Sequence, residues 1–315
     1  MRRSSTTVLV SAPVEALLYI PWFKFEPWYV GPLPIQPFGI LVAIGVLLGA
    51  KIAEVWGKKN GIAPHAVSDV IAHVVLGGFV FGYFLNAAFY HPERYIEIWN
   101  DPTQLWKKYL GLSSYGGFIG AVIGLLVWKK RRGLSLIAVG EAACFAFPFG
   151  WLFGRLGCFT VHDHPGQVTD FFLAVDNYQA GEPPFEPRHD LGLYEVFWAL
   201  AVIGLFLFLA RRKRPRGTYM ALLPLLYAPI RFFLDYLRAE PDAGGDVRYG
   251  GLTPGQWASF LILGLGLYVL WYMRTQPEPT LPEDAQWPRP EPAKGAGPAG
   301  AKKSRAKRKK AQGAK

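Results

Sequence analysis

The chain has 315 residues, of which 51% are hydrophobic, and its formal net charge is +11 at pH 7. A chain of this length can form two soluble domains, but here the apolar residues occur in long uninterrupted blocks, which disfavours a soluble fold. The two cysteines, Cys144 and Cys158, do not indicate a disulfide framework. The composition therefore favours a membrane protein.

The segment before the first apolar block, residues 1–34, is predicted to form an arm in the outer membrane interface. Pro13 and Glu15 interrupt its mildly apolar stretch and no convincing cleavage site follows, so a removable signal peptide is not expected. Trp22 and Trp28 are amphipathic side chains of the kind that anchor a segment where hydrocarbon meets water.

Residues 35–274 contain apolar blocks close to the length of a spanning helix, which needs about 20 residues. Seven such blocks lie near residues 36–56, 68–90, 113–128, 134–154, 192–210, 217–236 and 254–273. Any single block could also be a helix in a large soluble core, but very little polar sequence separates the blocks. The sequence therefore predicts an all-α, polytopic membrane domain with about seven transmembrane helices.

Lysine and arginine mark alternate loops of this domain. They follow the first block at Lys58–Lys59, the third at Lys129–Arg132, the fifth at Arg211–Arg216 and the seventh at Arg274. Because positive residues stay on the cytoplasmic side, the N-terminus is predicted to be periplasmic and the C-terminus cytoplasmic. The opposite loops hold histidines, carboxylates and single arginines, so we expect the chemistry at the outer surface.

The last segment, residues 275–315, is rich in Pro, Ala, Gly and Lys and is predicted to be a disordered cytoplasmic tail. It ends in a basic run, residues 302–310, that resembles a nucleic-acid-binding sequence. The run would lie beside a membrane rich in anionic lipid, which attracts basic segments. We therefore expect contact with membrane lipids or a topological role, and no nucleic-acid partner.

Polar groups within or beside spanning helices are costly, so each one marks a candidate site. The first group is Tyr115–Gly116–Gly117, at the start of the third block. Glycines let a helix or a lipid approach the backbone closely. Helix packing and substrate binding both remain open for these glycines.

The second group lies at the end of the fourth block, where Arg155 is followed by His162, Asp163 and His164. An arginine at this depth can simply extend to the interface. Two histidines that flank an aspartate are harder to explain in that way, because imidazole exchanges protons near neutral pH. A metal held by His162, His164 and His189 is disfavoured, because their spacing matches no standard ligand motif.

The third group lies around the sixth block. Arg231 and Asp235 are four residues apart and share a helix face, Arg238 follows one turn later, and Glu195 opens the fifth block. Arginines that lie close together at headgroup depth, with carboxylates that orient their guanidinium groups, can bind a phosphate. Ion pairs that only hold the helices together are the alternative, and the sequence does not separate the two.

The order and spacing of these groups over residues 35–274 resemble the prolipoprotein diacylglyceryl transferase family. The family signature Gly-Arg-x-Gly-Asn-Phe continues with a glutamate and a glycine, five and eight residues beyond the asparagine. The matching positions here are Gly154, Arg155, Gly157, Cys158, Phe159, Asp163 and Gly166; His189, Leu193, Tyr194 and Glu195; Arg231, Asp235, Arg238, Pro241 and Asp242; and Thr253, Gly255 and Gln256.

Several polar positions depart from the family pattern. Tyr115 stands where the family has a histidine, Cys158 replaces an asparagine and Phe38 replaces a tyrosine. Aspartates at 163 and 235 replace glutamates. A tyrosine, with an unperturbed pKa near 10, is a poorer base than imidazole at neutral pH.

The resemblance implies an enzyme of the bacterial inner membrane that moves the diacylglyceryl group of phosphatidylglycerol onto the lipobox cysteine of prolipoproteins and releases glycerol phosphate. The arginines would hold the phosphate, and a base would take the thiol proton. No metal or organic cofactor is implied. The catalytic candidates are His162, His164, Tyr115 and Asp163, and the substrate-binding candidates are Arg155, Arg231, Arg238, Asp235, Glu195, Gly116, Gly117, Cys158, Gly166 and His189.

A second hypothesis is a paralogue that has lost the transfer reaction and binds phospholipid or a lipidated partner at the outer leaflet. The retained arginines suit that role as well. The histidine pair favours the enzyme, because a lipid-binding protein has little use for groups that titrate near pH 7.

Overall fold

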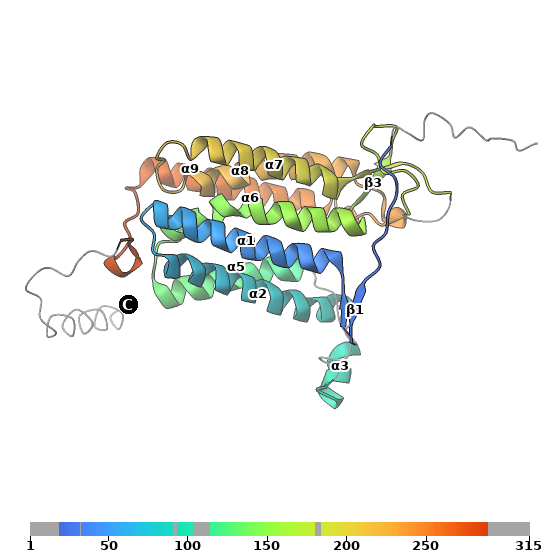
Figure 1. Cartoon of the computed structure of the whole chain (residues 1–315), viewed down its shortest axis with the longest axis horizontal. Coiled ribbons are helices and arrows are strands. Elements are labelled where there is room, and N and C mark those ends of the chain that lie inside the picture. Colours follow the sequence, from blue (N-terminus) through green and yellow to red (C-terminus); the bar gives the residue numbers. More distant parts are fainter. Residues whose placement is uncertain (1–18, 32, 91–92, 104–113, 180–183, 289–315) are drawn as a thin grey trace, which may run out of the picture.

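The computed structural model describes residues 19–31, 33–90, 93–103, 114–179 and 184–288. Long helices run side by side and form one elongated bundle (Figure 1). Six of the described helices are long and apolar enough to cross a membrane. They are α1 (Pro37–Lys59), α2 (Pro64–Tyr90), α6 (Leu136–Val161), α7 (Leu191–Leu209), α8 (Thr218–Leu234) and α9 (Pro254–Thr275). The predicted all-α, polytopic architecture is confirmed.

The third predicted span, 113–128, corresponds to α5 (Ser114–Arg132), which lies in the bundle against α2. Its last four residues are basic, so its apolar part is shorter than in the other six helices. Glycines bring the two helices into backbone contact: a Cβ on Gly120 would lie 2.1 Å from the carbonyl oxygen of Gly77. Such close approach is typical of helix packing in membranes.

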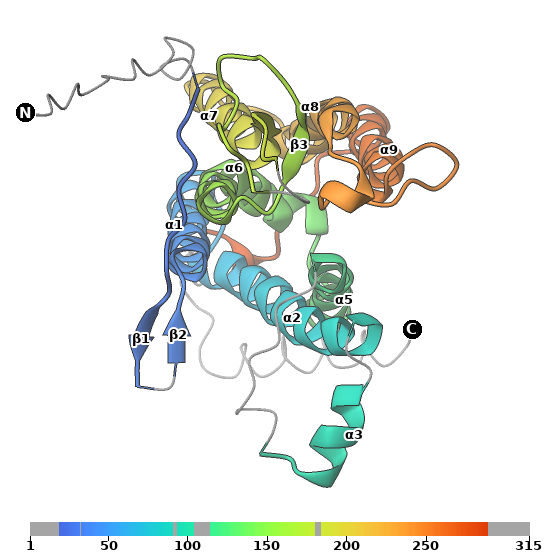
Figure 2. The same ribbon diagram turned by 90° about the vertical axis from the view of Figure 1, so that its right-hand side faces the viewer.

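Helix α6 is the central helix of the bundle. It packs against α1, α2, α7 and α8, and viewed from the end that carries β3 it lies between α1 and α7 (Figure 2). One buried apolar cluster joins α6 to α1, α2 and α5 around Trp128 and Val139, and a second joins it to α7 and α8 around Phe145 and Phe206.

Short elements gather at one end of the bundle. They comprise the hairpin β1 (Trp28–Val30) and β2 (Leu33–Ile35), the helix α3 (Glu93–Asn100), the antiparallel pair β3 (Pro165–Val168) and β4 (Arg188–Asp190), and the 3-10 turns Asp235–Leu237 and Pro241–Ala243. The figure shows α3, β1 and β3 at the end opposite the turn between α1 and α2 (Figure 1). These are the loops that the charge pattern assigns to the outside.

The chain after α9 differs from the prediction of disorder from residue 275. Residues 276–288 fold back onto the turn between α1 and α2, where Leu281 and Ala285 are buried in the apolar cluster. The Ala63 amide donates to the Ala285 carbonyl at 2.9 Å, and the Trp287 amide donates to the Gly61 carbonyl at 3.0 Å. These apolar anchors within a proline-rich segment explain the order. The rest of the predicted tail, 289–315, lies outside the described residues.

Candidate functional site

Two arginines meet one buried carboxylate where α6, α7 and α8 approach one another. Glu195, the fifth residue of α7 (Leu191–Leu209), is fully buried. Its Oε1 accepts a hydrogen bond from Nη1 of Arg231 at 3.3 Å, and its Oε2 lies 2.9 Å from Nε of Arg155. The Trp151 indole donates to the same Oε2 at 3.0 Å, so this carboxylate orients both guanidinium groups.

The Arg155 guanidinium keeps donor capacity for another group. Its Nε–H is not aligned with Glu195, and within the described structure this buried atom has no hydrogen-bond partner. The guanidinium also stacks over the Trp151 ring, with 4.5 Å between Cζ and the ring centroid. Buried donors are normally satisfied, so an unpaired one in a polar cluster is a candidate contact for a ligand oxygen.

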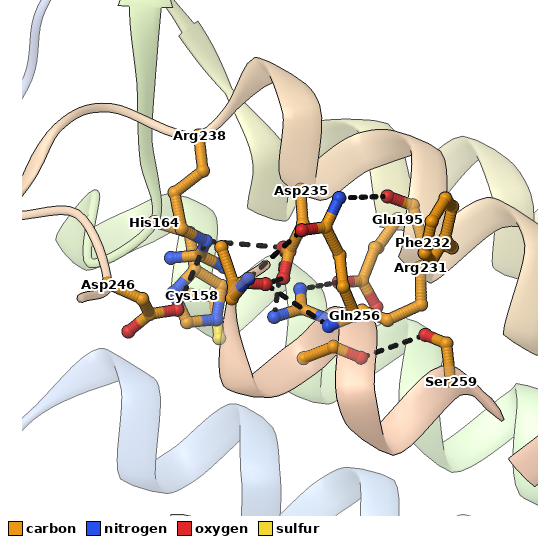
Figure 3. Close-up of polar contacts among 12 residues, drawn as sticks. Cys158, His164, Glu195, Arg231, Phe232, Asp235, Arg238, Asp246, Gln256 and Ser259 are labelled. Carbon is orange, nitrogen blue, oxygen red and sulfur yellow. Dashed lines mark hydrogen bonds and ion pairs between the residues drawn. The ribbon is translucent and has the colours of Figure 1, made fainter. Parts of the chain in front are cut away.

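A second carboxylate, Asp235, extends the cluster to Arg238 (Figure 3). Its Oδ1 lies 3.1 Å from Nη2 of Arg231 and accepts a hydrogen bond from Nε of Arg238 at 3.2 Å. The Thr253 hydroxyl donates to Oδ2, and Thr253 also caps α9. Gly255 has to lack a side chain here, because its Cβ would lie 2.3 Å from Oδ2 of Asp235.

Arg238 faces two carboxylates, since its Nε also lies 3.3 Å from Oδ2 of Asp246. The formal charge of the cluster is thus balanced: three arginines, Arg155, Arg231 and Arg238, face three carboxylates, Glu195, Asp235 and Asp246. Balanced arginines in fixed positions can bind a phosphate through directed N–H groups rather than through excess charge.

Three reactive side chains lie beside Arg155 at the end of α6. Nη1 of Arg155 is 3.8 Å from Sγ of Cys158, and donor atoms of Cys158, Asp163 and His164 lie within 4.8 Å of one another. Burial raises the pKa of Asp163. Burial, followed by the positive charges of Arg155 and Arg238, holds the pKa of His164 well below its usual value. The His164 ring is therefore neutral at pH 7.

The tautomer of neutral His164 follows from one contact. Its Nδ1 lies 2.8 Å from the carbonyl oxygen of Asp163, which can only accept. Nδ1 therefore carries the proton and Nε2 carries the lone pair. The ring is 23% exposed, which leaves it accessible from the end of the bundle that carries the short elements.

His162 occupies a different environment, although it is only two residues away. Its Nδ1 pairs with Oδ2 of Asp190 at 2.7 Å, its side chain is 1% exposed, and its ring stacks on Trp22 at 4.3 Å. Asp190 also caps α7 by accepting from the Leu193 amide at 3.0 Å. His162 thus joins the end of α6 to the start of α7 beneath the N-terminal arm.

Most of the remaining predicted site residues pack closely against neighbouring parts of the chain. A Cβ on Gly166 would lie 2.5 Å from Cβ of His189, and one on Gly116 would lie 2.6 Å from the Phe81 carbonyl oxygen, so both glycines permit close packing. Gly117 also faces α2, less tightly. Nδ1 of His189 contacts the Tyr194 hydroxyl, and burial lowers the pKa of His189. The side chain of Tyr115 is not among those that the structure describes.

Sequence reasoning missed two aromatic members of the cluster. Trp151 lies one helical turn before Arg155, and Tyr227, whose hydroxyl donates to Glu195 at 3.4 Å, lies one turn before Arg231. The four-residue spacing on a helix was the available signal.

Comparison with known proteins identifies relatives of this chain. A model of the prolipoprotein diacylglyceryl transferase family matches residues 27–272. The phosphatidylglycerol–prolipoprotein diacylglyceryl transferase of Janthinobacterium sp. (strain Marseille) is 31% identical over 76% of this chain and 92% of its own length. The proteins of that name from Nitratidesulfovibrio vulgaris (strain Hildenborough) and Bordetella avium are 33% and 28% identical, over 76% and 84% of this chain and 91% and 100% of their own lengths. The chain belongs to the prolipoprotein diacylglyceryl transferase family.

Proposed function

We propose that this chain transfers the diacylglyceryl group of phosphatidylglycerol to the lipobox cysteine thiol of prolipoproteins, a step of lipoprotein maturation. The observation that carries the proposal is the pairing of Arg155 and Arg231 with one buried carboxylate, Glu195, at the end of the bundle that holds the polar loops. The names of the relatives state the same two substrates.

The arginines bind the phosphate and stabilise it as it leaves. The thiol sulfur attacks the carbon of the diacylglyceryl unit that is bonded to the phosphate oxygen. A carbon–sulfur bond forms and the carbon–oxygen bond breaks. Glycerol phosphate departs with the electron pair of the broken bond. Negative charge develops on the departing phosphate oxygen. Arg155 and Arg231, helped by Arg238, meet that charge with groups already oriented by Glu195 and Asp235. Fixed donors need no reorganisation during the reaction.

The thiol is activated at His164. A thiol reacts mainly as thiolate, so its proton has to be removed. His164 lies beside the arginines with its Nε2 lone pair free for this role, and Asp163 adjoins it. His162 is the weaker candidate of the pair, because its ring is enclosed by Trp22 and Asp190.

The protein acts in the inner membrane of a bacterium, with the site at the periplasmic face. The support is the multi-pass bundle together with the basic residues in alternate loops. Residues 1–34 form the outer arm, 35–274 the transferase domain and 275–315 the cytoplasmic tail, of which 276–288 pack on the bundle.

The test is a transfer assay with the full-length chain in detergent, phosphatidylglycerol and a lipobox peptide, with mass spectrometry of the thioether product. Complementation of a strain depleted of its own transferase is the parallel test in cells. We expect thioether product and growth. Lipid binding without product would instead identify a paralogue that has lost the transfer reaction.

A further inference from the structure

Cys158, Asp163 and His164 gather three different donor groups at the outer end of α6. A thiol sulfur, a carboxylate oxygen and an imidazole nitrogen lie within 4.8 Å of one another. Cys158 and His164 lie next to each other beside Arg238 (Figure 3). The phosphate-binding role of the arginines does not use these three donors together.

We propose that Cys158, Asp163 and His164 bind a divalent metal ion of zinc type and leave its fourth coordination position open. Zinc takes thiolate, imidazole and carboxylate ligands at about 2.0–2.3 Å, so its tetrahedral ligands are about 3.3–3.8 Å apart. The donors of the three side chains therefore have to close by up to about 1–1.5 Å when the ion binds. Three protein ligands with one open position are the arrangement of catalytic rather than structural zinc sites.

The backbone around the three ligands is fixed by contacts that do not involve their donor atoms. His162 ends α6 in the left-handed region, at φ 49°, and its carbonyl accepts from the Tyr178 hydroxyl at 2.8 Å. The His164 carbonyl accepts from the Leu191 amide at 3.1 Å, which ties the turn to the start of α7. A frame of this kind lowers the cost of assembling a metal site.

Contacts next to the three donor atoms also match a metal site. The Nδ1–H of His164 points to the Asp163 carbonyl, which leaves Nε2 as the ligand atom. A ligating imidazole usually donates its other ring N–H in this way. Nη1 of Arg155, at 3.8 Å from Sγ, can donate to the Cys158 thiolate.

Charge at the site permits the ion despite the neighbouring arginines. The thiolate of Cys158 and the carboxylate of Asp163 supply two negative charges, His164 is a neutral ligand, and a divalent ion adds two positive charges. The occupied site is therefore neutral overall. The proton displaced from the Cys158 thiol passes to solvent when the sulfur–metal bond forms.

The open position gives the site a use in thiol activation, which rests on the proposed transferase function. A substrate thiol that coordinates a divalent metal ion loses its proton to water and becomes a bound thiolate. The sulfur can then attack the lipid while Arg155 holds the phosphate. With the metal bound, His164 acts as a ligand, and its role as the free base belongs to the metal-free chain.

The test loads the full-length chain in detergent, after chelation, with Co²⁺ and then with Zn²⁺. Co²⁺ reports a sulfur ligand through its thiolate-to-metal absorption band, and elemental analysis gives the metal content. We expect one ion per chain, with the band lost in Cys158→Ser and Cys158→Asn and the affinity lowered at least about 10-fold in His164→Ala. Cys144→Ser, which changes the other cysteine within the bundle, is the matched control and should keep the band.

The same preparations separate this inference from the proposed function. Chelation should lower thioether formation and Zn²⁺ should restore it. Cobalt that binds without the sulfur band, or equally well to Cys158→Asn, overturns the metal site. If the chelated chain transfers at full rate, the activating role is wrong while the transferase proposal stands. If the loaded chain shows the band but forms no thioether, the metal site stands and the transferase proposal fails.

Discussion

At the scale of single residues, the arginine cluster combines tight pairing with donors that are left for a ligand. Arg155 and Arg231 share Glu195, and Arg231 and Arg238 share Asp235. A bundle held together only by ion pairs would gain little from this arrangement, because replacing buried ion pairs by apolar residues is often neutral or stabilising. The direction of the guanidinium N–H groups is therefore the property that the proposed function uses.

Replacing the arginines by lysine tests whether direction or charge matters. Arg155→Lys and Arg231→Lys keep the charge but lose the planar fork, so each should lower thioether formation by about 100-fold, the scale for loss of one preorganised donor. Arg132→Lys, at an ion pair with Asp69 between α2 and α5, is the control and should keep its activity. Full activity in both site variants would leave these arginines as structural pairs.

The two histidines should respond differently to substitution. His164→Ala should cut turnover by about 100-fold with little loss of thermal stability, because the partly exposed ring acts on the thiol. His162→Ala should instead lower the melting temperature, because its buried pair with Asp190 joins α6 to α7. Turnover and thermal unfolding of both variants are measured on the same preparations.

Tyr115→Phe completes this series, and we expect a smaller loss of turnover than in His164→Ala. Raising the pH should partly rescue His164→Ala, since more of the substrate thiol is then ionised without help. A fully active His164→Ala beside an inactive Tyr115→Phe would transfer the role to the tyrosine.

At the scale of helices, glycine spacing determines how closely α2 and α5 approach. Gly77, Gly120 and Gly124 all face the opposite backbone at distances that leave no room for a methyl group. The glycines predicted as either packing or binding positions, Gly116 and Gly117, lie on the same helix, and Gly116 packs directly against α2. Packing therefore accounts for Gly116.

Gly120→Ala should destabilise the bundle by about 1–3 kcal/mol, the usual cost of overpacking, because its Cβ would meet the Gly77 backbone at 2.1 Å. Gly264→Ala in α9 is the matched control: it is also a helical glycine, but its Cβ would meet nothing within 4 Å. Thermal unfolding in detergent measures both. Equal melting temperatures would show that α2 and α5 can separate without cost.

Helix positions followed from hydropathy, whereas helix ends and contacts did not. The fourth block was predicted to end at 154, but α6 continues to Val161 through Arg155 and Cys158. Hydropathy falls at Arg155, while the structure compensates that charge with Glu195 from another helix. A pairing between residues 40 positions apart leaves no local trace in the sequence. The clustering of Arg231, Asp235 and Arg238, by contrast, follows from spacing on one helix, and the structure confirms that they contact one another.

At the scale of the whole molecule, the segment 276–288 closes the bundle at the end away from the site. It connects α9 to the turn between α1 and α2, and Arg216 Nη1 donates to the Pro279 carbonyl at 2.8 Å. Composition suggested disorder because proline and charge dominate the segment. Leu281 and Ala285 anchor the segment in the apolar cluster, and a compositional window is too coarse to detect two residues.

The topology of the chain depends on α5. The six clear spanning helices alone would place both termini on the same side, so a periplasmic N-terminus and a cytoplasmic C-terminus require α5 to cross as well. Its basic end, Lys129–Arg132, and the close contact with α2 along its glycines both favour a crossing.

Reporters inserted after Arg216 and at the C-terminus should then be active in the cytoplasm, and one inserted within the 165–188 loop should be active in the periplasm. If the 165–188 loop and the C-terminus report the same side, the model of alternate positive loops fails. If the two report opposite sides but a reporter at the N-terminus reports the cytoplasm, α5 does not cross.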